Sequence, residues 1–215
     1  MVLKKYMNEN YIEVGVDEVA RGCIFGRVYA AAVILNNNID VPSNVKIDDS
    51  KKLSKKQREK AYEYIINNAI DYGVGWVDEK YIDEHNILNA SMLAMHKALN
   101  NLQNIPQLIL VDGIHFKPHE CIPHEEYSLR EERIPYECIP HGDAIYLSIA
   151  CASIIAKVEH DKYIIELCNE YPELNDYYNL SSNVGYCCKK HLNGIIEHGY
   201  SQYHRISFNI KSLSK

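Results

Sequence analysis

The stretch Gly15-Val16-Asp17-Glu18-Val19-Ala20-Arg21-Gly22 ends an apolar run with two adjacent carboxylates. The patterning of residues 11–18 and 28–36, with glycines between them, predicts two antiparallel strands joined by a turn. Carboxylates are costly in a core strand unless they are paired or bound to a cation. Consecutive residues of a regular strand face opposite sides, so we expect a bulge, a twist or a strand end here.

Helical and strand-like segments alternate after this hairpin. Helices are predicted at about residues 55–71, 81–102, 144–167 and 185–198, and strands at about 73–77 and 108–111. Ser54 is a favourable N-cap for the first of these helices. Residues 114–139 are polar and contain prolines, which predicts a loop or a surface hairpin. The order of elements predicts a mixed α/β layered domain with a small C-terminal helical cap.

Composition narrows the class of protein. The chain has 215 residues, of which 47% are hydrophobic, enough for one domain with a small appendage. Its apolar runs are far shorter than the roughly 18 to 20 residues that cross a membrane, and its first ten residues do not resemble a signal peptide. We therefore expect a cytoplasmic protein without a membrane partner.

Charge is distributed unevenly along the chain. The net charge of −6 argues against a uniformly basic nucleic-acid-binding surface. However, residues 46–60 carry seven Lys or Arg against three acids, and residues 185–215 carry five against one. Such segments are commonly solvated helix faces, but they could also contact phosphates.

Four acids lie at abrupt boundaries of apolar elements: Asp17, Glu18, Asp112 and Asp143. They would converge if the first and fourth strands were neighbours. Clustered carboxylates repel one another unless they are protonated or bridged by cations, and oxygen-only ligands favour Mg²⁺ or Mn²⁺. Two such ions could support phosphodiester hydrolysis. A single acid before a helix is more often a cap, a role that Asp143 also fits.

A local duplication leaves the fourth acid ambiguous. Residues 120–124 (Glu-Cys-Ile-Pro-His) recur as residues 137–141, and each copy is followed two residues later by a carboxylate, Glu126 or Asp143. The duplicated segment also contains five potential zinc ligands: His119, Cys121, His124, Cys138 and His141. Their spacing is not that of a common zinc motif, so duplication is the simpler explanation.

Six ordered blocks resemble the signatures of the ribonuclease HII family: residues 15–22 (GVDEVARG), 48–54 (DDSKKLS), 111–113 (VDG), 142–161 (GDAIYLSIACASIIAKVEHD), 185–191 (GYCCKKH) and 203–208 (YHRISF). The resemblance extends from about residue 12 to 208. It implies a ribonuclease H-like mixed five-stranded sheet flanked by helices, with a catalytic domain at residues 1–170 and a substrate-binding cap at 171–215.

The resemblance also implies an activity and a metal site. The four acids would bind Mg²⁺ or Mn²⁺. The substrates would be RNA/DNA hybrids and duplex DNA containing ribonucleotides, cut on the 5′ side of the ribonucleotide to leave 3′-hydroxyl and 5′-phosphate ends. No obligate protein partner is implied.

Substrate-binding residues follow from the same blocks. Ala20, Arg21 and Gly22 match the family's Gly-Arg-Gly backbone that contacts the ribose 2′-hydroxyl, with Ala20 in place of the first glycine. Tyr186 matches a tyrosine that packs on the neighbouring sugar, although Cys187 and Cys188 depart from the family pattern. The cations expected along the duplex are Lys51, Lys52, Lys189, Lys190 and Arg205.

Two other functions remain open, the first of them because of these departures. A catalytically weakened homologue would bind nucleic acid without cutting it efficiently. A DNA nuclease on the same fold would cut duplexes that contain no ribonucleotide.

Overall fold

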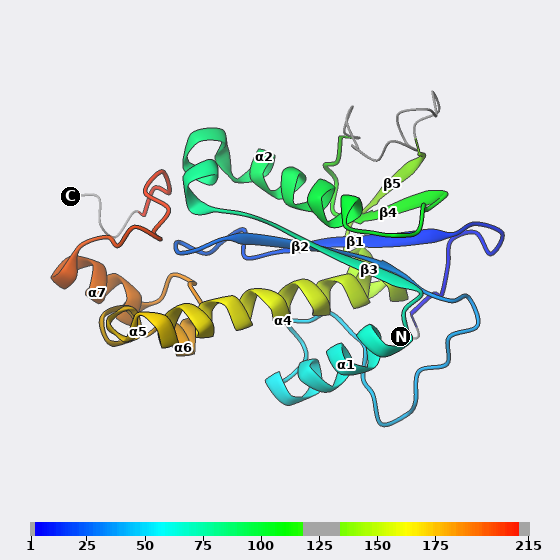
Figure 1. Cartoon of the computed structure of the whole chain (residues 1–215), viewed down its shortest axis with the longest axis horizontal. Helices are drawn as coiled ribbons and strands as arrows, with labels where there is room; N and C mark the ends of the chain where they lie inside the picture. Colours follow the sequence, from blue (N-terminus) through cyan, green and yellow to red (C-terminus); the bar gives the residue numbers. More distant parts are fainter. Residues whose placement is uncertain (1–2, 118–133, 211–215) are drawn as a thin grey trace.

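The computed structural model describes residues 3–117 and 134–210 and contains a mixed five-stranded sheet (Figure 1). Its strands are β1 (Glu13–Val19), β2 (Val28–Ile34), β3 (Asp71–Val77), β4 (Leu108–Asp112) and β5 (Tyr136–Ile139). They are arranged in the order β3-β2-β1-β4-β5. β2 is antiparallel to both β1 and β3, whereas β4 is parallel to β1 and β5. The first and fourth strands are therefore neighbours, which is the condition under which the four acids would approach one another.

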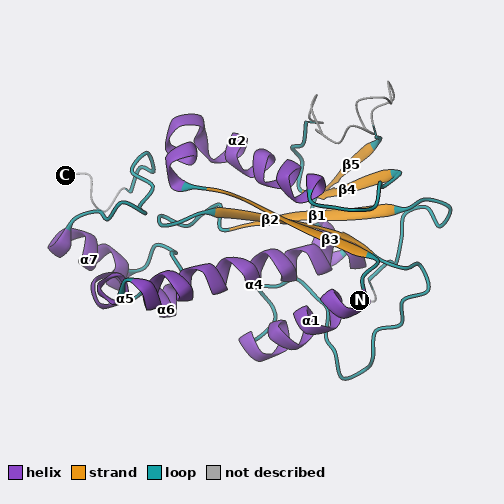
Figure 2. Ribbon diagram, viewed as in Figure 1, coloured by secondary structure: helices purple, strands orange, loops and turns teal. Residues whose placement is uncertain are grey.

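Helices cover both faces of the sheet. The helices are α1 (Lys55–Asn68), α2 (Glu79–Asn100), α4 (Leu147–Glu170), α5 (Pro172–Tyr178), α6 (Leu180–Asn183) and α7 (Lys189–His198). Helix α2 packs on one face of the sheet, and α1 and α4 pack on the other. The three short helices α5 to α7 gather at the C-terminal end of α4 and form the predicted cap (Figure 2).

The core is divided by the sheet into two layers. All seven residues of β2 are buried, because alternate side chains face α2 and the α1/α4 layer. β1 and α4 approach each other closely: a Cβ on Gly15 would lie 2.3 Å from the carbonyl carbon of Ser148. Only glycine permits this approach, which places the start of α4 beside the strand that carries Asp17 and Glu18.

A third apolar cluster joins the cap to the turn between β1 and β2. Phe25 of this turn packs with Ile164 of α4 and with Leu174, Leu180 and Ile195 of the cap. The cap is therefore packed against α4 and the turn between β1 and β2 through a shared core. A domain boundary at residue 170 coincides with the end of α4 but stays a prediction.

Several element boundaries differ from the sequence expectations. Residues 136–139 form the edge strand β5, where a loop or hairpin was predicted. Helices α5 and α6 lie between the predicted helices at residues 144–167 and 185–198, where no helix was predicted. Helix α4 begins at Leu147, because residues 142–144 form a separate 3₁₀ turn. Within α2, Asn86 has φ 67° and accepts hydrogen bonds from the amides of Leu88 and Asn89, so it starts a new helical segment.

The helices of the described residues include none that is both long enough and apolar enough to span a membrane.

Candidate active site

Asp17 and Glu18 lie where β1 extends beyond its parallel neighbour. β1 pairs with β2 residue for residue through Val19, without a bulge, whereas its pairing with β4 ends at Val16 opposite Val111. Of the three expected features, a bulge, a twist or a strand end, the structure shows a strand end: the parallel pairing of β1 with β4 stops just before Asp17. The two acids border the open end of β4, where Asp112 is the last residue of the strand.

Asp17 is the most strongly perturbed acid of the group. Its side chain is 5% exposed. Burial raises its pKa well above 3.8, and the charges of Glu18, Asp112 and Asp143 raise it further. A hydrogen bond from Ser153 of α4 opposes this rise in pKa. A second contact orients the carboxylate, because Asp17 Oδ1 accepts the Glu18 amide at 2.7 Å. Asp17 therefore favours a proton or a cation near its oxygens.

Glu18 is turned toward an arginine of the following turn. Burial raises its pKa, while the charge of Arg21 and a hydrogen bond from it act in the opposite direction. The Arg21 Nη1 atom lies 3.0 Å from Glu18 Oε1, and the Arg21 side chain is 47% exposed. Because an exposed arginine is easily displaced, this ion pair leaves Glu18 available to another cation.

Asp112 and Asp143 come together through the turn that precedes α4. Gly142 donates its amide to Asp112 Oδ1 at 2.6 Å, which brings the next residue, Asp143, close to β4. Burial raises the pKa of Asp143, and so do the charges of Asp112 and then Asp49, while Lys51 lowers it. Asp143 therefore lies in the same electrostatic field as Asp17, rather than acting only as a helix cap.

This donor set suits a hard divalent cation. Among the residues that the structure describes, no three His, Cys, Asp or Glu side chains already surround a common point at ligand distance. Glu18 faces Arg21 and Asp112 faces the Gly142 amide, so the carboxylates influence one another's pKa without converging fully. A cation would relieve their repulsion, and four carboxylates offer only oxygen ligands, which Mg²⁺ and Mn²⁺ prefer.

The turn after β1, residues 20–27, carries the expected ribose-contacting backbone. Ala20 is 2% exposed and has φ 71°, a left-handed conformation that disfavours any residue with a Cβ. The family glycine at this position therefore has a conformational reason, and alanine is strained there. Gly22 differs, since a Cβ there would meet nothing within 4 Å. The space beside Gly22 leaves its backbone accessible to a ligand.

Tyr186 lies next to this turn. Its backbone forms an antiparallel bridge with Cys23, and Ile24 donates its amide to Gly185 O at 3.0 Å. The Lys157 ammonium lies 5.2 Å from the centroid of the Tyr186 ring. The structure therefore brings Tyr186 beside the residue 20–22 backbone, although more than 160 residues separate them in the sequence.

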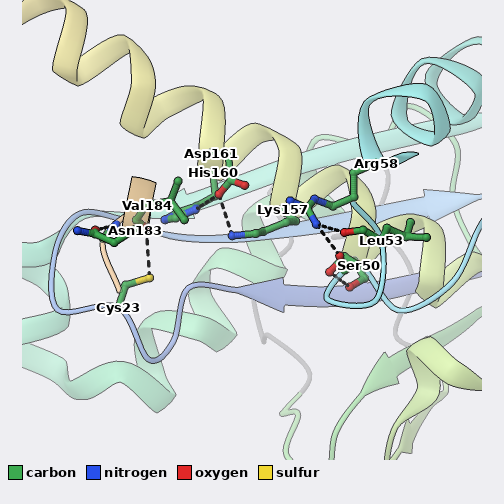
Figure 3. A network of polar contacts seen from close by, with 11 residues as sticks. Cys23, Ser50, Leu53, Arg58, Lys157, His160, Asp161, Asn183 and Val184 are labelled. Atoms are coloured by element: carbon green, nitrogen blue, oxygen red, sulfur yellow. Dashed lines mark hydrogen bonds and ion pairs between the residues drawn. The ribbon is translucent and has the colours of Figure 1, made fainter. Parts of the chain in front are cut away.

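A polar network on α4 supports this region. Lys157 and His160 both contact Asp161 Oδ1, at 2.8 and 3.0 Å, and lie between the Cys23–Val184 contact and the Arg58 contacts (Figure 3). Burial raises the pKa of Asp161, but the hydrogen bond from His160 and the charge of Lys157 outweigh it and lower the pKa. Sequence reasoning missed this network; its only signal was three polar residues among the apolar positions of a long helix.

The predicted cations separate into two groups. Lys51, Lys52, Lys189 and Lys190 are exposed and available to phosphates. Arg205 was expected on the same surface, and this is wrong: its side chain is 0% exposed. Its guanidinium instead donates to backbone carbonyls of residues 20–27, which satisfy the donors of the buried charge.

The duplicated segment is only partly described. His119, Cys121, His124 and Glu126 lie outside the described residues. The first three residues of the second copy lie in β5, and Asp143 follows the copy two residues later, within the 3₁₀ turn. The proposed zinc ligands therefore stay untested as a set.

Comparison with known proteins identifies relatives along nearly the whole chain. The family model described as ribonuclease HII matches residues 14–211. A ribonuclease HII from Phocaeicola vulgatus is 44% identical over 97% of this chain and 94% of its own length. One from Caldicellulosiruptor bescii is 42% identical over 98% of this chain and 94% of its own length.

Solved structures share the fold. The ribonuclease H2 from Pyrococcus horikoshii superimposes with a TM-score of 0.70 at 27% identity, covering 91% of this chain and 93% of that one. The ribonuclease HII of Archaeoglobus fulgidus, solved as a complex with PCNA, gives a TM-score of 0.66 at 22% identity, covering 93% and 96% of the two chains. At this identity the second likeness concerns the fold alone.

Proposed function

The chain belongs to the ribonuclease HII family of metal-dependent endonucleases that act on RNA/DNA substrates, and on this premise we propose its specific reaction. It cleaves the RNA strand of hybrids, and it cuts duplex DNA on the 5′ side of embedded ribonucleotides. The products carry 3′-hydroxyl and 5′-phosphate ends. It acts in the cytoplasm and needs no obligate protein partner.

The observation that carries this proposal is the position of the buried, mutually repelling carboxylates beside the residue 20–22 backbone. Asp17, Glu18, Asp112 and Asp143 would hold two Mg²⁺ or Mn²⁺ ions, which activate a water and stabilise the leaving 3′ oxygen. The raised pKa of Asp17 and Asp143 supports the assignment, because burial and neighbouring carboxylates outweigh the charge of Lys51 at Asp143, and no nearby cation offsets them at Asp17. Binding a cation requires Glu18 to exchange its contact with Arg21.

Recognition of ribose is assigned to the turn and to Tyr186. A 2′-hydroxyl can both donate and accept a hydrogen bond, and the backbone of Gly22, where a Cβ would meet nothing within 4 Å, offers partners without a side chain in the way. Tyr186 provides an aromatic surface for the adjacent sugar. Strain at Ala20 makes this recognition less favourable than glycine would.

Phosphate contacts come from exposed cations on both sides of this region. Lys51 and Lys52 approach from the segment before α1, and Lys189 and Lys190 from the start of α7. Each neutralised phosphate releases counterions, so affinity should fall steeply with salt. The C-terminal cap thus contributes to substrate binding, which supports its assignment to residues 171–215.

The test is a cleavage assay on a 5′-labelled duplex that contains one ribonucleotide. We expect one cut on its 5′ side with Mg²⁺ or Mn²⁺ and none with a chelator. Binding without cleavage in either metal would contradict the enzymatic proposal and favour a weakened homologue. Cutting of the matched all-DNA duplex at a similar rate would instead indicate a DNA nuclease.

A further inference from the structure

Arg205 is a buried cation for which the described residues provide no carboxylate partner within ion-pair distance. Burial lowers its pKa to about 10, the direction expected when a charge loses water. A charge buried in this way is costly unless its donors are all satisfied. The groups that accept hydrogen bonds from the Arg205 guanidinium therefore indicate its structural role.

Among the described residues, the hydrogen-bond acceptors of its guanidinium are all carbonyl oxygens of a single turn, and the guanidinium also lies 5.3 Å from the centroid of the Phe208 ring. Nη1 donates to Ala20 O and Cys23 O, each at 2.8 Å, and to Arg21 O at 3.3 Å. Nε donates to Gly26 O at 2.8 Å, and Nη2 donates to Arg27 O at 2.9 Å. One planar guanidinium thus fixes five carbonyl directions within residues 20–27, which a lysine ammonium could not do.

Two of these carbonyls belong to the backbone assigned to the ribose. Ala20 holds a left-handed conformation that its Cβ opposes, and such strain persists only when surrounding contacts enforce it. Arg205 supplies such a contact, two residues after Glu18. The side chain itself does not reach a ligand, because the turn covers it.

The neighbouring residue, His204, is linked through His191 to the backbone of Tyr186. The Ser201 amide donates to His204 Nδ1 at 2.9 Å, so the other ring nitrogen of His204 carries the proton. His204 Nε2 then donates to His191 Nε2 at 3.1 Å, and His191 Nδ1 donates to Tyr186 O at 3.0 Å. The segment that holds the turn also holds the backbone of Tyr186.

We propose that Arg205 is a positioning residue for ribose recognition: through its five carbonyl contacts it sets the residue 20–22 backbone at the orientation that a 2′-hydroxyl requires. This inference rests on the function proposed above. It assigns no substrate contact to Arg205 itself. Its loss should therefore reduce discrimination between ribose and deoxyribose more than general affinity for DNA.

The test compares binding of two duplexes that differ by one 2′-hydroxyl. Affinities are measured in Ca²⁺, a larger cation that accepts looser oxygen geometry, for a duplex with one ribonucleotide and for its all-DNA counterpart. In Arg205→Lys we expect the preference for the ribonucleotide to fall by about tenfold and kcat/KM in Mg²⁺ to fall by about 10- to 100-fold, as for small misplacements at a distance. Affinity for the all-DNA duplex should change little.

Asp83→Asn is the matched control. Asp83 anchors the same segment from α2, accepting the Ser207 amide at 3.0 Å and the Ile206 amide at 3.1 Å, but it does not contact the turn. This variant should lower the unfolding temperature and keep the preference. If Asp83→Asn loses the preference as Arg205→Lys does, general loosening explains both and the inference is wrong.

The outcomes separate the two proposals. A wild-type protein that neither prefers nor cuts the ribonucleotide duplex contradicts the proposed function. A wild-type preference that Arg205→Lys retains contradicts only the role of Arg205.

Hydrogen exchange of the wild-type protein covers the case in which Arg205→Lys does not fold. The amides of Cys23, Ile24 and Gly26 should exchange as slowly as those of β2. Exchange of these amides within seconds would mean that the turn is not held, and would overturn the inference.

Discussion

The active site has two parts, the carboxylate group around Asp17 and Asp143 and the polar network around Arg205 and His204, and they differ in how their buried charged and polar groups are compensated. Around Asp17 and Asp143 the carboxylates are buried together, and burial and their mutual repulsion raise the pKa of both. Around Arg205 and His204 each buried polar atom of the two side chains has a partner within the protein. The carboxylate group, the incomplete half, lacks a compensating cation until a metal ion binds. The Arg205 and His204 network, the organised half, is already compensated by hydrogen bonds within the protein. If the proposed roles hold, the chemistry would depend on metal, whereas ribose recognition would depend on the fold.

The largest expected effect is at the incomplete half. Asp17→Asn should lower cleavage of the single-ribonucleotide duplex by about 10³-fold or more, since it removes a ligand from a group of residues that act together. The same change should raise the metal-free unfolding temperature, because it removes a repelling charge. Residual activity within tenfold of wild type would place the catalytic centre elsewhere.

The duplicated carboxylates provide the next comparison. Asp143→Ala should reduce activity by about 10²-fold, because Asp143 shares the field of Asp112 and Asp17. Glu126→Ala, the equivalent change after the first repeat, should leave most of the activity. Cleavage rates of the two variants on the same substrate show whether Asp143 or Glu126 is the metal ligand. The reverse result would assign the ligand to the first repeat.

Metal binding should stabilise the protein as well as activate it. A folded-state pKa raised above 3.8 means that the folded protein holds protons which the unfolded chain has released. Without metal, the free energy of unfolding should therefore fall as pH rises above about 4. At a metal concentration 100 times its Kd we expect a gain of about 2.7 kcal/mol, measurable as a higher unfolding temperature. Asp17→Asn should lose most of this gain.

The organised half should respond to acid with the opposite sign. Burial, and then the neighbouring His191, lower the pKa of His204 to about 3, so the folded protein keeps this imidazole neutral while the unfolded chain protonates it near 6.5. The stability contributed by the neutral form is complete above about pH 6.5 and is lost as pH falls toward 3. We expect a loss of about 1 kcal/mol or more between pH 6.5 and 4.5 in denaturant titrations. His204→Gln should flatten this slope; an unchanged slope would assign it to other groups.

The smallest expected effect concerns the strain at Ala20. Ala20→Gly should raise the free energy of unfolding by about 1 kcal/mol, because glycine adopts φ 71° without opposition from a Cβ. Preference for the ribonucleotide duplex should stay equal or improve. A loss of stability would mean that the turn tolerates alanine without strain.

A feature could be predicted from the sequence when neighbouring residues in the chain determine it, and was missed when contacts between distant residues determine it. Asp17, Glu18 and Asp112 were recognised because acids interrupt apolar runs, and the pairing of the first and fourth strands brought them together. β5 was missed because its four residues are half-buried or exposed, and only pairing with β4 makes them a strand. Helices α5 and α6 were missed because their segment is rich in polar residues.

Arg205 shows a different limit. Its charge predicted exposure, and its burial depends on carbonyls that lie about 180 residues earlier. The His191–His204 pair was invisible for the same reason, since neither histidine has a local pattern that reveals its partner. Buried polar networks are specified by tertiary contacts, which residue type alone does not encode.

The contact between Arg205 and the turn also has a consequence for the order in which the parts of the active site form during synthesis. The bond from Arg205 Nη1 to Ala20 O joins residues 185 positions apart. Because synthesis proceeds from the N-terminus, all four carboxylates are made well before the guanidinium that aligns the ribose-contacting backbone. If Arg205 positions this backbone as proposed, a nascent or truncated chain that ends before Arg205 would carry the acids of a nuclease without its means of selecting ribose. Selectivity would then be the last property that the growing chain acquires.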